Sequence, residues 1–197
     1  MSVRDVAIAA VCVLGGCVED RTLGVVRINE VSPANVASCV DVFGEYDDWI
    51  ELYNSSGTTV NLGGYQLIDD GAIAALIADG VTVPPRGYLL LWADDQKQGL
   101  DHLPFKLGAG GDTVTLTAPD DRAVDEVAWA SADPDESFAR IPNGGGDFTS
   151  CAAPTCGASN GAGCARRAPP AQSPGNSSMP AKMSSTISAT PSESVTD

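Results

Sequence analysis

The sequence Asp-Asp-Trp-Ile-Glu-Leu-Tyr-Asn at residues 47–54 decides the fold, with Ile-Asn-Glu-Val at residues 28–31 before it and Val-Asn-Leu-Gly-Gly-Tyr at residues 60–65 after it. In an extended chain, Trp49, Glu51 and Tyr53 point to one face, and Ile50 and Leu52 point to the other. Large side chains stand on both faces. We therefore predict a β-strand that is partly covered on both sides.

Similar strand signals recur along the chain between Gly, Asn, Asp and Pro turns, with no amphipathic pattern long enough for a helix of ten residues. This spacing is typical of a β-sandwich. Residues 87–94 are almost all apolar, which predicts a central strand. In residues 113–117, Val114 and Leu116 are predicted to face the core and the three threonines to face water. The alanine-rich residues 71–80 are predicted to form a loop.

Further pieces follow in order: Pro-Pro-Arg-Gly-Tyr-Leu-Leu-Leu-Trp-Ala-Asp at 84–94, Phe-Lys-Leu at 105–107, Gly-Gly-Asp at 110–112, Val-Asp-Glu-Val at 124–127 and Ser-Phe-Ala-Arg-Ile-Pro-Asn-Gly at 137–144. In order and spacing, these pieces resemble the lamin tail domain of nuclear lamins and of many exported bacterial proteins. The resemblance covers residues 25–160 and implies an all-β, immunoglobulin-like β-sandwich. The family closes on Thr-Pro-Gly-Ala-x-Asn, whereas Cys156 replaces the proline here, which suggests a local staple.

The chain is acidic, with a formal net charge of -15 over 197 residues. Its basic residues within the expected domain are scattered singly and form no basic face. A phosphate backbone would be repelled by such a surface. Nucleic acid is therefore excluded as an expected partner.

Residues 1–16 are typical of an export signal, with Arg4 followed by an apolar run, and they end in Leu-Gly-Gly before Cys17. This ending resembles a bacterial lipobox, in which the cysteine is lipidated and becomes the mature N-terminus. We predict a lipoprotein signal peptide at 1–16, a membrane anchor at Cys17, a linker at 17–24, and an exported protein held at the outer membrane or cell surface. A plain secretory signal or a buried first strand is the alternative. No other apolar run has the ~20 residues of a membrane span.

Four more cysteines, Cys39, Cys151, Cys156 and Cys164, fall outside the leader. Export permits disulfides, and an even number favours two of them. Three pairings are possible, but Cys39 is far from the other three, so one bond is expected to tie an early loop to the end of the domain. A zinc site is the less favoured alternative, because the paired Cys-x2-Cys spacing is absent.

Adjacent aspartates occur at four predicted strand ends or turns, and clustered carboxylates at loop tips can hold calcium. The densest group is the predicted calcium site: Asp41, Glu45, Asp47 and Asp48. The alternative is that these aspartates only form turns and a solvated surface, since no Asp-x-Asp-x-Asp-Gly loop is present. The pairs at 69–70, 94–95 and 120–121 are expected to lie on the surface.

His102 is the only histidine, so any Ser-His or Cys-His nucleophilic pair would have to use it. We predict a packing or rim role for it, with no catalytic residue in the chain. The sequence has no Gly-x-Ser-x-Gly elbow, no His-Glu-x-x-His and no phosphate-binding loop. An enzyme is not expected, and no cofactor other than calcium.

Residues 161–197 are rich in Ser, Pro, Ala and Thr and poor in large apolar residues, so a disordered tail is predicted there. The leading hypothesis is a non-enzymatic, lipid-anchored, extracytoplasmic module that binds a protein or glycan of the bacterial cell envelope. The first alternative is a calcium-dependent adhesive or structural domain. The second is the accessory domain of an exported hydrolase.

Overall fold

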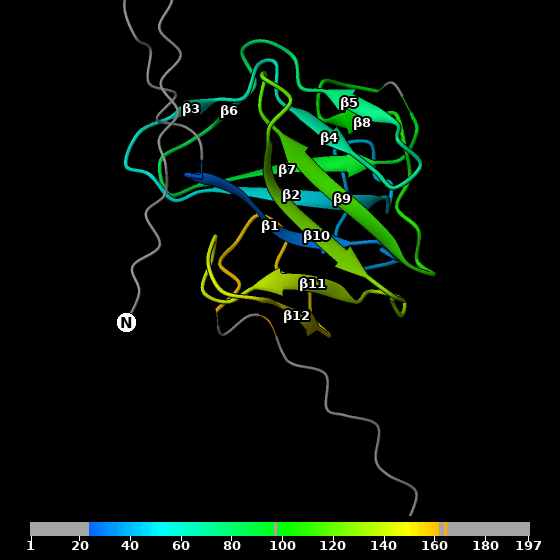
Figure 1. Ribbon diagram of the computed structural model, residues 1–197. Helices are drawn as coiled ribbons and strands as arrows, with labels where there is room; N and C mark the ends of the chain where they lie inside the picture. The colour runs from blue at the N-terminus through cyan, green and yellow to red at the C-terminus, as the bar shows by residue number, and fades with distance from the viewer. Residues whose placement is uncertain (1–23, 97, 162–163, 165–197) are drawn as a thin grey trace, which may run out of the picture. The chain divides into compact units, whose positions relative to one another are not determined.

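The computed structural model describes residues 24–96, 98–161 and 164 (Figure 1). The predicted signal peptide, the lipidation residue Cys17 and nearly all of the predicted tail lie outside these residues. The described part contains twelve strands and no helix. It is therefore all-β, as the sequence predicted.

The largest sheet has six strands in the order β12-β11-β1-β2-β7-β8. These strands are β12 (Phe148–Cys151), β11 (Ser137–Arg140), β1 (Val26–Ser32), β2 (Asp48–Asn54), β7 (Tyr88–Ala93) and β8 (His102–Leu103). All neighbours are antiparallel except β7 and β8, which are parallel. Residues 87–94 were predicted to form a central strand. β7 does lie between β2 and β8, but β8 pairs only with its last two residues, Trp92 and Ala93, so the prediction is confirmed at that end of the strand.

The second sheet has four strands in the order β10-β9-β4-β5, namely β10 (Ala123–Trp129), β9 (Asp112–Thr117), β4 (Gln66–Ile68) and β5 (Ala74–Leu76). Figure 1 shows β9 and β10 crossing over β1, β2 and β7, which is the arrangement of a sandwich. A two-stranded ribbon of β3 (Val60–Asn61) and β6 (Thr82–Val83) completes the fold.

The core lies between the two larger sheets. Buried residues of the six-stranded sheet, such as Ile28, Ile50 and Leu52, pack in one cluster with Val114 and Leu116 of β9. The alternation predicted for residues 47–54 and 113–117 is confirmed at these positions. Burial of such side chains is the main source of stability in a sandwich of this size.

Two details differ from the sequence analysis. Within residues 71–80, β5 forms because its backbone pairs with β4 and because Ala75 and Ile77 are buried, whereas Leu76 is exposed. Alanine has little strand preference, which concealed this alternation. Thr117, the last residue of β9, is buried and does not face water, whereas Thr113 and Thr115 are half-buried.

The outer face of β1 and β2 is covered by residues 155–160, here called the C-terminal strap. Glu30 and Glu51 are both fully buried beneath it. Glu30 accepts hydrogen bonds from the backbone N–H and the hydroxyl of Thr155, and Glu51 accepts one from the backbone N–H of Gly157 at 2.6 Å. Asn160 donates to the carbonyl of Asn29 at 3.0 Å. Two buried carboxylates thus hold the strap on the sheet.

The staple at Cys156 is not local. Cys156 forms a disulfide with Cys39, 117 residues earlier, and a second disulfide joins Cys151 to Cys164. The Cα–Cα separations are 6.3 and 5.1 Å. The first bond is the predicted tie between an early loop and the end of the domain. It fixes the strap to the segment that connects β1 to β2.

Candidate metal centre

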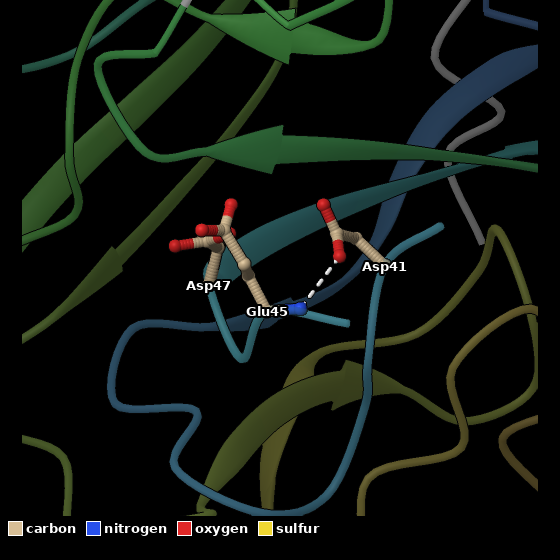
Figure 2. Close-up of side chains that lie close together, drawn as sticks. All are labelled: Asp41, Glu45 and Asp47. Atoms are coloured by element: carbon tan, nitrogen blue, oxygen red, sulfur yellow. Dashed lines mark hydrogen bonds between the residues drawn. The ribbon is translucent and has the colours of Figure 1, made fainter. Parts of the chain in front are cut away.

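Three of the four predicted calcium ligands come together in the β1–β2 loop, residues 33–47. One carboxylate oxygen from each of Asp41, Glu45 and Asp47 lies within 4.8 Å of the others. Figure 2 shows Glu45 and Asp47 side by side, with Asp41 facing them from the opposite arm of the loop. The grouping therefore places three oxygen ligands around one point.

Local hydrogen bonds set the direction of the Asp41 carboxylate. Its Oδ1 accepts from the backbone N–H groups of Phe43 and Glu45 at 2.9 and 2.7 Å. This is an Asx-type turn, in which an aspartate bonds the backbone two residues on. The turn engages Oδ1 and leaves Oδ2 to face the cluster (Figure 2).

The base of the loop is also fixed. The Asn35 side chain donates to the carbonyls of Cys39 and Asp47, at 2.6 and 2.7 Å, and so holds the two arms together. Asp135 accepts from three successive backbone N–H groups, those of residues 36–38. Burial acts to raise the pKa of Asp135, but these hydrogen bonds outweigh it and the pKa is lowered. Together with the Cys39–Cys156 disulfide, these bonds give the loop a defined shape.

The fourth predicted ligand, Asp48, does not join the group. It is the first residue of β2, whereas Asp47 is the last residue of the loop. Its Oδ1 accepts from the backbone N–H of Asn35 at 3.2 Å. Burial raises the pKa of Asp48 to about 6.

Three further residues, His102, Asp94 and Gln98, belong to this site and were not predicted from the sequence as part of it. The predicted packing role for His102 accounts for its burial, but its Nε2 lies 3.9 Å from Oδ2 of Asp41. Its Nδ1 is hydrogen-bonded to Asp94, which is 2% exposed and not on the surface as predicted. Gln98 donates to Glu45 at 2.8 Å. The parallel pairing of β8 with β7 brings His102 to this loop, and no spacing in the sequence indicates it.

The site gathers negative charge in a partly dry environment. Burial raises the pKa of Asp47, and the neighbouring charges of Asp94, Glu45 and Asp41 raise it further. Six buried side-chain atoms of the described residues have no hydrogen-bond partner, and four of them are here: Asp41 Oδ2, Asp47 Oδ2, Gln98 Oε1 and His102 Nε2. Three of the four are oxygens that can only accept. Such a group is suited to a cation.

The comparison with known families agrees with the fold. The model of the Lamin Tail Domain family matches residues 20–131, which is more than half of the chain. The chain belongs to the lamin tail domain family. No curated protein matches it. The match includes all the residues of the candidate centre and confirms the predicted family and its immunoglobulin-like sandwich.

The matched residues of the lamin tail domain end after β10, so β11, β12 and the C-terminal strap lie beyond them. All four cysteines predicted to form disulfides do so, which leaves no thiol among them to bind zinc. Two disulfides are typical of a protein that folds outside the cytoplasm. Among the described residues, no helix is long and apolar enough to cross a bilayer. An immunoglobulin-like lamin tail domain is consistent with a non-enzymatic module.

Proposed function

We propose that this lamin tail domain protein is a non-enzymatic module of the bacterial cell envelope that binds another envelope component. It is exported, anchored through lipid at Cys17 to the outer membrane or cell surface, and its partner is a protein or a glycan. The two disulfides and the leader sequence support export.

The observation that carries the binding role is the exposed apolar surface of the β1–β2 loop. Five of the eight large hydrophobic side chains exposed in the described residues belong to it: Val36, Val40, Val42, Phe43 and Tyr46. Val42 is 86% exposed. Apolar side chains gathered on one segment of an acidic surface are typical of an interaction site.

The loop is also held in shape before any partner arrives. The Asn35 bonds, the Asp135 bonds and the Cys39 disulfide reduce the freedom that binding would otherwise remove. Three of the five exposed side chains are valines, which fit an apolar protein surface better than a sugar ring, for which flat aromatic groups are the usual contacts. We therefore favour a protein partner over a glycan.

Cross-linking in intact cells tests this function. A photo-reactive residue at position 42 should yield a discrete cross-linked band, and Phe43→Ser should abolish it by removing an exposed aromatic contact of the loop. Leu76→Ser is the matched control, because Leu76 is 69% exposed but lies on β5. Equal cross-linking in Phe43→Ser and wild type would contradict the loop as the binding surface. Cys17→Ala should move the protein from the membrane to the soluble fraction, and unchanged fractionation would contradict the anchor.

A second candidate function is a calcium-dependent adhesive or structural domain, which the grouping of Asp41, Glu45 and Asp47 favours. An ion bound only by the native state stabilises it by mass action. The midpoint of a thermal melt should then rise with added calcium and fall in chelator. Asp47→Asn should remove the response, and an unchanged midpoint in wild type would contradict this function.

A further inference from the structure

We infer that the carboxylate cluster and the imidazole beside it form one site for a divalent transition-metal ion of the zinc class. The proposed ligands are Asp41, Glu45, Asp47 and His102. This inference rests on the second function proposed above in that both place an ion at the same loop. It differs in the ion, which is of the zinc class and not calcium. Of the exposed apolar surface it uses Phe43 alone, whose ring lies against the imidazole of His102.

His102 supplies the observation that the acidic cluster alone would lack. Its side chain is fully buried, and its Nε2 has no hydrogen-bond partner among the described residues. The nearest acidic atom to it is Oδ2 of Asp41, at 3.9 Å, which is also buried and without a hydrogen-bond partner there. Two ligands of a tetrahedral zinc ion stand about 3.4 Å apart. A closer approach of about half an ångström would bring these two atoms to that separation.

Asp94 orients the ring for this role. It is buried, and it is hydrogen-bonded to Nδ1 of His102. A carboxylate on one ring nitrogen keeps the proton there and leaves the lone pair of the other nitrogen free for a metal. The Asp94–His102 pair has the arrangement of a carboxylate–histidine–metal triad, with Asp94 as the positioning residue.

Glu45 and Asp47 are the other two proposed ligands; one oxygen of each lies within 4.8 Å of one of Asp41, so Asp41 is the residue that connects them to His102. Glu45 is held by Gln98, and Asp47 lies beside it (Figure 2). The ring of Phe43 meets the imidazole edge to face, with centroids 5.6 Å apart, and covers that side of the site. One nitrogen and three carboxylate oxygens suit zinc, which binds both atom types in fours. Calcium takes six to eight oxygen ligands and gains nothing from an imidazole.

An ion-free alternative exists for the same residues. A protonated His102 would carry a positive charge between Asp94 on Nδ1 and, near Nε2, Asp41 at 3.9 Å and the half-exposed Asp101 at 4.0 Å, and these contacts would then be ion pairs. That arrangement requires no metal and satisfies Nε2 with a proton donated to Asp41. The two interpretations differ in what occupies the space between Nε2 and Asp41, so a probe of Nε2 separates them.

The chain has one histidine, so ¹⁵N imidazole resonances in the untagged, full-length protein report on His102 alone. The oxidised protein is alkylated to block free thiols, stripped with chelator, and titrated with Zn²⁺, Mn²⁺ or Ca²⁺. We expect one Zn²⁺ per chain, a large shift of the Nε2 resonance, and a protonated Nδ1 throughout. His102→Gln should weaken Zn²⁺ binding at least tenfold, and Asp121→Asn, an exposed aspartate elsewhere, should leave it unchanged.

The fold of His102→Gln is checked by circular dichroism. Glu45→Gln, at a half-buried loop position, is a second variant that should also weaken Zn²⁺ binding. It serves as the test if His102→Gln, a change in the core, disturbs folding. Zn²⁺ binding that is unchanged in both variants would overturn the inference. Calcium binding with an unmoved Nε2 resonance would overturn the choice of ion but support the calcium-dependent function. A ring protonated on both nitrogens, with no ion bound, would overturn both, and the partner-binding function would stand.

Discussion

Replacement of Glu51 by glutamine is expected to remove a large part of the pH dependence of the protein's stability. Glu51 is fully buried between β2 and the C-terminal strap. It accepts from the side chain of Asn29 at 2.7 Å and from the backbone N–H of Gly157 at 2.6 Å. Burial raises the pKa of Glu51 to about 7, and the nearby charge of Glu30 adds to the rise, although these hydrogen bonds oppose it.

The sign follows from the raised pKa. The folded protein holds a proton on Glu51 up to about pH 7, whereas the unfolded chain releases it near the ordinary value of 4.5. The stabilisation is fully present below pH 4.5 and is lost as the pH rises through 7. Between pH 5 and 8 the free energy of unfolding should fall by about 2.5 kcal/mol on account of this group, taking 1.36 kcal/mol per pKa unit. The raised pKa of Asp48 acts in the same direction, so the difference between wild type and variant isolates Glu51.

Urea unfolding at pH 5, 6, 7 and 8 measures this difference, with fluorescence of the three buried tryptophans as the signal. Glu51→Gln loses one acceptor, which lowers stability by about 1–3 kcal/mol at every pH. Its curve should therefore start below that of wild type and flatten. Glu126→Gln, an exposed change on β10, should follow wild type. A Glu51→Gln curve parallel to wild type would refute the reasoning, because it would mean that Glu51 is already ionised in the folded protein at pH 5.

Three further outcomes are expected at neutral pH. Cys39→Ser removes the disulfide to Cys156, 117 residues away in the sequence. In the chain-entropy model this should lower the free energy of unfolding by about 5 kcal/mol relative to the oxidised wild type. A loss below 1 kcal/mol would contradict it. Thr117→Val should raise the free energy of unfolding by about 1 kcal/mol, seen as a higher urea midpoint, because the buried Thr117 hydroxyl has no hydrogen-bond partner among the described residues; a lower midpoint would show that the hydroxyl is bonded. Asp125→Ala should cost about 3–5 kcal/mol, since it leaves Arg140, 2.7 Å away, without its buried carboxylate; the double change with Arg140→Met should recover part of this loss.

Much of the fold could be predicted because it depends on local alternation. Ile50 and Leu52 face the core, and Trp49 and Glu51 are buried on the other side of the same strand. A strand with large side chains on both faces must be covered twice, and the sequence carries that information directly. It does not say what provides the second cover, which is the C-terminal strap. The burial of Thr117 could not be predicted either, because strand alternation gives it the same face as the half-buried Thr113 and Thr115.

The candidate centre was predictable only in part. Asp41, Glu45 and Asp47 lie within seven residues of one loop, so their proximity follows from the sequence. His102 joins them because two-residue β8 runs parallel to the end of β7. A contact made by so short a parallel pair has no periodicity or motif that could reveal it. Asp94, the residue after β7, forms an isolated bridge with Lys106 and is buried there, which no pattern in the sequence indicates either.

The Cys39–Cys156 disulfide joins the C-terminal strap to the loop that carries the candidate centre. Cys39 lies in the loop that carries Asp41, and Cys156 lies in the strap that covers Glu51. If the bond is reduced, the loop keeps the Asn35 and Asp135 hydrogen bonds, but the strap loses its covalent tie to the loop. Release of the strap would open the outer face of β2, where Trp49 packs beside Trp92 and Cys39. Reduction is therefore expected to act on the strap and on the outer face of β2, while the hydrogen bonds of Asn35 and Asp135 still hold the loop.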